Sequence, residues 1–283
     1  MPASCVRIIV VAMLPLLLGG CGVLERGVMN HAGPIAESQW HLYLIVGAVL
    51  IFVAGPVLLL TPIIAWHYRL SNKHSAFRPQ WVFSWPLEGL IWIPPIAIVI
   101  GLSFVMWHYT QRLDPYRPIA SNQPALEIQA VGFDWKWLFI YPDQHVALLD
   151  KLVIPVGRPV HISLTSGTVM QSLMIPRLGG QIYAMAGMTT QLNLAASEAG
   201  IFRGENTQFN GEGFQNQKFD VTAFAADDFE RWLADVQAAS HPLDASAYAE
   251  LFEKSTPPAP IDFSSVPEGL FQRILKQSRE PRS

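Results

Sequence analysis

The chain has 283 residues, a length that allows one or two domains. Charged residues make up only 14% of it and hydrophobic residues 51%, whereas about 25% charged residues is usual in soluble proteins. The formal net charge is −3, and no phosphate-binding loop is present, so the composition argues against a partner made of nucleic acid. The shortage of charge is local and indicates membrane-spanning segments.

Residues 1–20 have the pattern of a secretory signal peptide. Arg7 supplies the positive charge, and residues 8–18 form an apolar stretch that is short for a bilayer span. The sequence Leu-Gly-Gly-Cys follows and ends at Cys21. This sequence resembles the bacterial lipobox, which implies that Cys21 becomes the lipidated N-terminus of the mature chain. The alternative is an ordinary signal peptide with a cysteine nearby.

Two largely uncharged stretches are long enough to cross a hydrocarbon layer of about 30 Å. The first is residues 42–66, which contain no formal charge and have aromatic residues at both ends. The second is residues 86–109, in which Pro94 and Pro95 are expected to kink the helix or to break its first turns. The sequence therefore predicts a transmembrane hairpin.

The connection between the two spans, residues 67–85, contains Arg69, Lys73 and Arg78 but no acidic residue. The positive-inside rule places such a connection in the cytoplasm. The N-terminal segment, residues 21–41, and everything after the second span then lie in the periplasm. A lipobox also requires an exported N-terminus, so both signals predict a two-pass protein of the bacterial inner membrane.

Glu88 is the ionisable residue at the start of the second span. Acidic residues close to hydrocarbon are rare and often functional. The alternative is a capping glutamate in the first turn of a helix that begins at Pro86. The residues alone leave both interpretations open.

From residue 110 to residue 226 the pattern changes to short strands punctuated by glycine and proline. Apolar and polar residues alternate in three runs, 133–141, 159–165 and 218–224. The alternation in the first run places Phe133, Trp135 and Trp137 on one face of a strand. Many short strands at this spacing predict an all-β Greek-key sandwich or barrel.

The last segment, residues 227–283, is predicted to be a helical extension. Apolar residues recur at helical spacing in 227–236, and two shorter amphipathic pieces follow at about 245–254 and 268–276. We expect the apolar faces to pack on the sandwich or on a partner subunit, and the last six residues to be disordered.

Five stretches of the chain carry a common resemblance, namely 88–94, 134–142, 169–179, 181–188 and the loop 204–217. They are similar to subunit II of the haem–copper oxidases, in particular of the quinol-oxidising cytochrome bo type. With the C-terminal extension, the resemblance covers nearly the whole mature chain. It implies that the β-sandwich is cupredoxin-like.

Copper-bearing members of the superfamily hold a dinuclear copper centre with two cysteines, two histidines and a methionine. The matching positions in this chain are Gln171, Asn206, Asn210, Phe214 and Gln217. A dinuclear copper centre needs bridging thiolates, and both cysteines of the chain lie at the extreme N-terminus. No histidine occurs between residues 162 and 240. The sequence therefore predicts a domain without metal and without a disulfide.

Eight further residues have less specific interpretations. Core or interface packing is favoured over electron entry for Trp135 and Trp137, because an electron received there would have no copper to reach. Arg177 and Asp134 are candidates for ion pairs with the catalytic subunit, and a solvated role is the alternative. A metal role is not favoured for His145 and His161, and Met185 and Met188 are expected to pack rather than to bind copper.

The resemblance implies subunit II of a complex that oxidises ubiquinol, reduces oxygen to water and moves protons outward. It places the haems, copper and quinol site in partner subunits, chiefly catalytic subunit I, beside small membrane subunits and without cytochrome c. It places Glu88 at the cytoplasmic mouth of a proton pathway. The alternative is a membrane-anchored lipoprotein for copper delivery or oxidase assembly, which exposed Met/His clusters would favour.

Overall fold

The computed structural model describes residues 27–72 and 80–279. The predicted signal peptide and the lipidation site at Cys21 lie outside the described residues, as do Lys73 and Arg78 of the connection. The chain divides into two compact units, residues 41–114 and the remainder. Each unit is described by itself.

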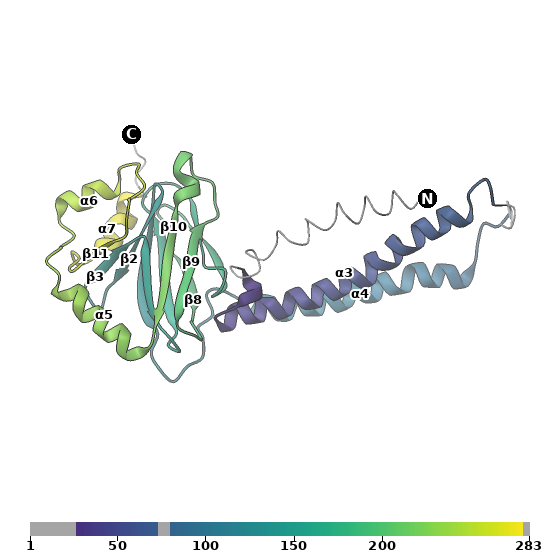
Figure 1. The fold of residues 1–283 in the computed structure, drawn as a ribbon, viewed down its shortest axis with the longest axis horizontal. Coiled ribbons are helices and arrows are strands. Elements are labelled where there is room, and N and C mark those ends of the chain that lie inside the picture. The colour runs from purple at the N-terminus through teal and green to yellow at the C-terminus, as the bar shows by residue number, and fades with distance from the viewer. Residues whose placement is uncertain (1–26, 73–79, 280–283) are drawn as a thin grey trace, which may run out of the picture. The chain divides into compact units, whose positions relative to one another are not determined.

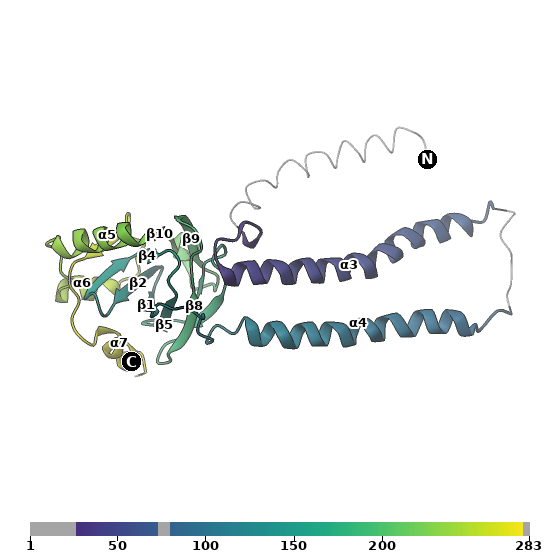
Figure 2. The ribbon, with the colours of Figure 1, turned by 90° about the horizontal axis from the view of Figure 1, so that it is seen from below.

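Two long helices, α3 (Pro34–His67) and α4 (Trp85–Arg112), correspond to the two predicted spans. Their mean hydropathies are 2.7 and 2.2, and both are long and apolar enough to cross a membrane. Both helices begin earlier than the predicted spans and end later. Pro94 and Pro95 lie inside α4, which Figure 2 shows as one unbroken helix, so the expected break in its first turns is wrong. Membrane-type helices tolerate internal proline because local adjustments satisfy the freed carbonyl groups.

The rest of the chain contains a sandwich of two β-sheets (Figure 1). A six-stranded sheet has the order β11-β3-β2-β1-β5-β8, and a five-stranded sheet has the order β4-β10-β9-β6-β7. The strands of the first sheet are β1 (Leu126–Phe133), β2 (Lys136–Tyr141), β3 (Val146–Leu149), β5 (Val160–Ser166), β8 (Thr190–Leu194) and β11 (Ile261–Phe263). Those of the second are β4 (Lys151–Pro155), β6 (Gln171–Met174), β7 (Gln181–Ala184), β9 (Gly200–Asn206) and β10 (Lys218–Phe224).

The main hydrophobic core fills the space between the two sheets. β1 pairs in parallel with β5, β4 pairs in parallel with β10, and the other ladders are antiparallel. In this core the Tyr141 hydroxyl donates to the carbonyl oxygen of Val153 at 2.7 Å and accepts from its N–H at 2.9 Å. Burial raises the pKa of Tyr141, so the hydroxyl stays neutral and links β2 to β4 across the sandwich.

The prediction that Phe133, Trp135 and Trp137 share one face of a strand is wrong. Phe133 ends β1, Trp135 lies in a two-residue turn, and Phe133 pairs with Lys136 at the start of β2. Trp135 has a backbone φ of +68°, in the left-handed region. Because the chain reverses here, Trp137 faces the main core, whereas Phe133 faces the opposite side of the sheet.

The C-terminal extension packs on the sandwich in two places (Figure 1). Its first helix joins the main core through Phe229 and Val236, and the residues after that helix cover the outer face of the six-stranded sheet. The extension comprises α5 (Ala226–Ala238), α6 (Ala245–Leu251), β11 and α7 (Leu270–Gln277). A second apolar cluster forms beneath it from strand and extension residues, including Phe133, Leu138, Ile140, Leu149, Leu251, Phe263, Phe271 and Ile274. The expected helices and their packing on the sandwich are thus observed, whereas the short strand β11 was not predicted.

The N-terminal segment also packs on the sandwich. After the 3₁₀ turn η1 (Val28–Asn30), the N–H of Ala32 donates to the carbonyl of Arg177 at 2.7 Å. The carbonyl of Ala32 accepts from Ser197 N–H at 2.7 Å, and Ala36 is fully buried. Residues directly before the apolar part of α3 therefore belong to the β domain.

Candidate functional site

The five positions predicted to replace the copper ligands come together at one end of the sandwich. Gln171 begins β6, Asn206 ends β9, and the loop 207–217 with η2 (Glu212–Asn216) supplies the other three. The side chains of Gln171, Asn206 and Gln217 are buried, and those of Asn210 and Phe214 are half-buried. The four amide residues are called the amide cluster below.

Gln217 is the centre of the amide cluster. Its Oε1 accepts from Asn206 Nδ2 and from Asn210 Nδ2, each at 2.8 Å. Its Nε2 donates to Gln171 Oε1. Every pair in this set joins a neutral amide donor to a neutral amide acceptor, so the cluster needs neither a charge nor a metal to hold it.

The amide cluster also connects the three segments around it. Asn206 Oδ1 accepts from Ser172 N–H at 2.9 Å, which ties β9 to β6. Gln171 Nε2 donates to the carbonyl of Phe133 at 2.8 Å, which ties β6 to the end of β1. The cluster therefore fixes the loop relative to the β1–β2 hairpin by hydrogen bonds alone.

The residues at this site do not fit a dinuclear copper centre. Amide groups are poor substitutes for bridging thiolates, and both polar atoms of Gln217, the Nδ2 groups of Asn206 and Asn210, and Gln171 Oε1 are already used within the cluster. Phe214 has no ligand atom and packs edge-on against Phe209, with ring centroids 5.7 Å apart. Within residues 27–72 and 80–279, no group of three or more His, Cys, Asp and Glu side chains could hold a metal ion.

Glu88 lies in the first turn of α4, where its N–H donates to the carbonyl of the N-cap residue Ser84 at 3.0 Å. Its side chain is half-buried, and its Oε2 accepts from the indole Nε1 of Trp92 at 3.1 Å. The carboxylate therefore lies along the helix toward its interior rather than over the N-terminal amides.

The structure gives Arg177 partners within its own domain. Arg177 pairs with Glu198 at 2.8 Å, donates to the carbonyl of Asn30 at 2.6 Å and lies 4.9 Å from the centre of the Phe202 ring. Arg177 thus helps to hold the N-terminal segment. Asp134, the other candidate for an ion pair, is buried in the β1–β2 turn.

The two histidines and two methionines for which a metal role was not favoured are not part of the amide cluster. His161 Nδ1 is 3.0 Å from Asn193 Oδ1, and its Nε2 is 4.0 Å from Glu127 on the neighbouring strand. His145 is exposed, Met185 is half-buried and Met188 is 53% exposed. The expectation that Met185 and Met188 pack rather than bind copper stays a prediction.

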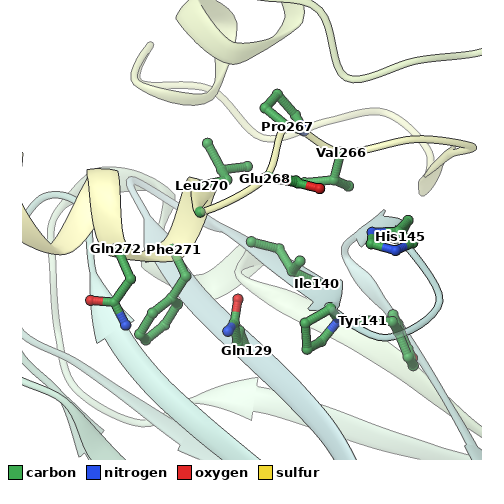
Figure 3. A pocket seen from close by; sticks show the side chains of 12 residues that line it. Gln129, Ile140, Tyr141, His145, Val266, Pro267, Glu268, Leu270, Phe271 and Gln272 are labelled. Carbon is green, nitrogen blue, oxygen red and sulfur yellow. The ribbon is translucent and has the colours of Figure 1, made fainter.

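A small pocket of about 180 Å³ lies where the β2–β3 turn meets the start of α7 (Figure 3). Tyr141 and His145 line one side of it, and Glu268 and Phe271 line the other. The pocket marks the boundary between the sandwich and its C-terminal extension, and it shares no residue with the amide cluster.

Sequence reasoning missed a buried lysine beside the amide cluster. Lys136 is only 2% exposed, and its Nζ donates to the carbonyls of Glu250 and Glu253 and to Ser255 Oγ, at 3.1, 2.8 and 2.7 Å. Burial lowers the pKa of Lys136, an effect that the nearby Asp150 opposes. A lysine that opens an apolar strand was the only signal in the sequence.

Residues 144–218 match the protein family described as cytochrome c oxidase subunit II, periplasmic domain. The cytochrome bo(3) ubiquinol oxidase subunit 2 of Pseudomonas putida is 41% identical over 260 residues, which cover 92% of this chain and 82% of that protein. The ubiquinol oxidase subunit 2 of Acetobacter aceti is 39% identical, with 92% and 84% covered. Among solved structures, the periplasmic domain of cytochrome oxidase subunit II from Bradyrhizobium japonicum aligns with a TM-score of 0.39 at 20% identity, covering 41% of this chain and 96% of that domain.

Two apolar helices followed by this sandwich define the class as subunit II of a haem–copper oxidase. The identity over nearly the whole chain narrows the class further. The chain belongs to the ubiquinol oxidase subunit 2 family, and it is a subunit of a ubiquinol oxidase complex of the respiratory chain.

Proposed function

We propose that this chain serves its oxidase as a structural and proton-entry subunit that carries no redox centre of its own. The observation that carries this proposal is the amide cluster, which fills the copper position with mutually bonded neutral side chains. Ubiquinol delivers electrons from within the membrane, so no copper relay facing the periplasm is required. The haems and copper then belong to catalytic subunit I, which works with small membrane subunits and without cytochrome c.

The proposed placement is a two-pass subunit of the bacterial inner membrane. The spans at residues 42–66 and 86–109 lie within α3 and α4, and the connection 67–85 faces the cytoplasm. The sandwich and its extension lie in the periplasm, and lipid on Cys21 adds to an anchor that the two helices already provide.

A lipoprotein for copper delivery or oxidase assembly is the other candidate. Copper carriers display soft sulfur or imidazole ligands, whereas the side chains gathered at the loop are amides and phenyl rings. Nothing in the described part of the chain specifically favours this candidate.

Purification in mild detergent tests the proposal. The tagged full-length chain should co-purify with haem and with quinol-driven oxygen consumption. Copper added to the purified complex should give no stoichiometric mixed-valence signal that depends on this chain. A lone chain without haem would support the assembly lipoprotein instead.

The proton-entry role of Glu88 rests on its place as the acidic residue in the first turn of α4. Glu88→Gln should slow quinol-driven oxygen consumption per haem, roughly tenfold or more if the carboxylate carries protons in the slow step. Glu88→Asp should be milder. Trp92→Phe removes the indole donor without removing the acid, and it should stay near the wild-type rate. Wild-type turnover of Glu88→Gln in an assembled complex would exclude the role.

A further inference from the structure

Trp135 occupies a backbone conformation that its side chain disfavours. Its φ of +68° lies in the left-handed region, which glycine and asparagine adopt most readily. For a bulky residue this conformation is strained, because Cβ lies close to the backbone carbonyl oxygen. A tryptophan in this turn therefore needs contacts that offset the strain.

The contacts of the Trp135 indole lie on the loop 207–216. A Cβ atom at Gly213 would lie 2.1 Å from Trp135 Cδ2, so the ring rests directly on bare backbone. At Gly211, whose φ is +115°, a Cβ atom would lie 3.5 Å from Cζ2. The indole Nε1 donates to the carbonyl of Asn210 at 3.3 Å. Only glycine fits beneath the ring at residue 213.

The loop is thus held by two sets of contacts. The amide cluster holds Asn206, Asn210 and Gln217 at the ends and in the middle of the loop. The indole covers the segment from Asn210 to Gly213. Gly211 and Gly213 have no side chains with which to join the amide cluster. In copper-bearing relatives a metal would cross-link this same loop.

We propose that Trp135 is a positioning residue that clamps the loop 207–216 in its folded conformation, in place of the cross-link that a metal would supply. The strained turn is retained because it aims the indole at the two glycines. The loop then keeps its shape without copper, and the aromatic ring serves this purpose rather than electron transfer. This role depends only on residues of this chain.

Hydrogen exchange of the full-length chain in its detergent-purified complex tests the clamp. Trp135→Gly removes the ring and also relieves the backbone strain, so the thermal stability of the domain should change little. The amides of residues 207–216 should nevertheless exchange at least tenfold faster, while those of β1, β2 and β9 keep their protection. Trp135→Phe keeps an aromatic ring without the N–H donor and should give an intermediate loop exchange rate.

His145→Gly is the matched control. His145 also has a positive φ, +58°, and it lies exposed in the β2–β3 turn. The change relieves strain without touching the loop, so loop exchange should equal that of the wild type. Wild-type loop exchange in Trp135→Gly would overturn the proposal, and so would an equal acceleration across all strands, which would indicate general destabilisation.

A substitution on the loop side gives an independent measurement. Gly213→Ala forces a Cβ into the indole and should loosen the loop by a similar factor. In the Trp135→Gly background the ring is absent, so Gly213→Ala should add less than a twofold further change. Two fully additive effects would show that the glycine and the indole act separately and would contradict the clamp.

Discussion

Two buried polar clusters meet at the first residue of β2, and they differ in the charge of the side chains that hold them together. In the amide cluster, neutral side chains bond to one another around Gln217. In the second, here called the lysine cluster, the Lys136 ammonium bonds to Glu250, Glu253 and Ser255 of the C-terminal extension. The comparison shows that a buried charge is tolerated where each of its protons has an acceptor.

The two clusters also differ in what they fasten. The amide cluster fastens a loop to the sandwich from which it emerges, whereas Lys136 fastens the end of α6, which is distant in sequence. Two of its acceptors are carbonyls at and just beyond the C-terminal end of α6, those of Glu250 and Glu253, and the first of these also accepts from the N–H of Glu253. Lys136 acts there much as a capping residue does, with a full positive charge.

Lys136→Met should have the largest effect on stability. The change removes the donor to the Glu253 carbonyl, to Ser255 Oγ and, beside a backbone N–H that remains, to the Glu250 carbonyl, and loss of hydrogen bonds to a charged group costs about 3 kcal/mol here. Thermal unfolding of the purified complex should shift downward, and limited proteolysis should cut within 245–260 before it cuts the strands. Lys151→Met is the control, because the partly exposed Lys151–Asp262 pair at 2.9 Å should contribute less than ~1 kcal/mol. Equal effects of the two changes would contradict the difference drawn between the clusters.

Gln217→Leu should have a smaller effect of about 2 kcal/mol. It leaves Gln171 Oε1 and the Nδ2 groups of Asn206 and Asn210 without their partner in a buried site. Gln215→Leu changes an exposed glutamine of the same loop and should stay within ~0.5 kcal/mol of the wild type. Thermal unfolding measures both, and a neutral Gln217→Leu would show that the amide cluster is dispensable.

The smallest expected difference between the two clusters is in how the stability of the domain depends on pH. Asp150, close to Lys136, accepts from Trp137 N–H at 2.7 Å, and burial raises its pKa to about 7. The pKa of Asp150 in the folded protein lies above its value in the unfolded chain. The stability that the protonated Asp150 carboxyl contributes is therefore fully present below pH ~4 and is lost as the pH rises through 7. Asp150→Asn keeps the acceptor and removes the titration.

The unfolding temperature of Asp150→Asn, relative to the wild type, should therefore rise between pH 5 and pH 8. The shift caused by Gln217→Leu should be the same at both pH values, because none of the amide residues titrates. A constant offset between Asp150→Asn and the wild type would contradict the assignment of this titration to Asp150.

Much of this architecture could be predicted from local pattern. Strict alternation located β10 at its observed bounds, and uninterrupted apolar length located α3 and α4. The resemblance located the five positions at the loop, and the structure brings them together. These features are encoded within short windows, where periodicity and motif spacing are informative.

The features that the sequence did not predict correctly depend on contacts between residues that are far apart in the chain. The alternation of apolar and polar residues runs through the turn at Trp135 without a break, so it wrongly predicted one continuous strand. A tryptophan carries none of the usual turn chemistry and gives no sign that the chain reverses there. Lys136 was assigned no role from the sequence, because its acceptors around residues 250–255 could not be paired with it from spacing. The three residues of β11 become a strand only because β3 offers a free edge.

Synthesis from the N-terminus makes β11 the last strand to leave the ribosome, although it pairs with β3 near the middle of the chain. Until residues 243–274 emerge, the outer face of β1–β3 displays Phe133, Ile140 and Leu149 without cover. A stalled or truncated chain would therefore expose an apolar sheet face and an unpaired strand edge, which promote aggregation and chaperone binding. Loss of the last forty residues should act as a folding defect during biogenesis rather than as the trimming of a tail.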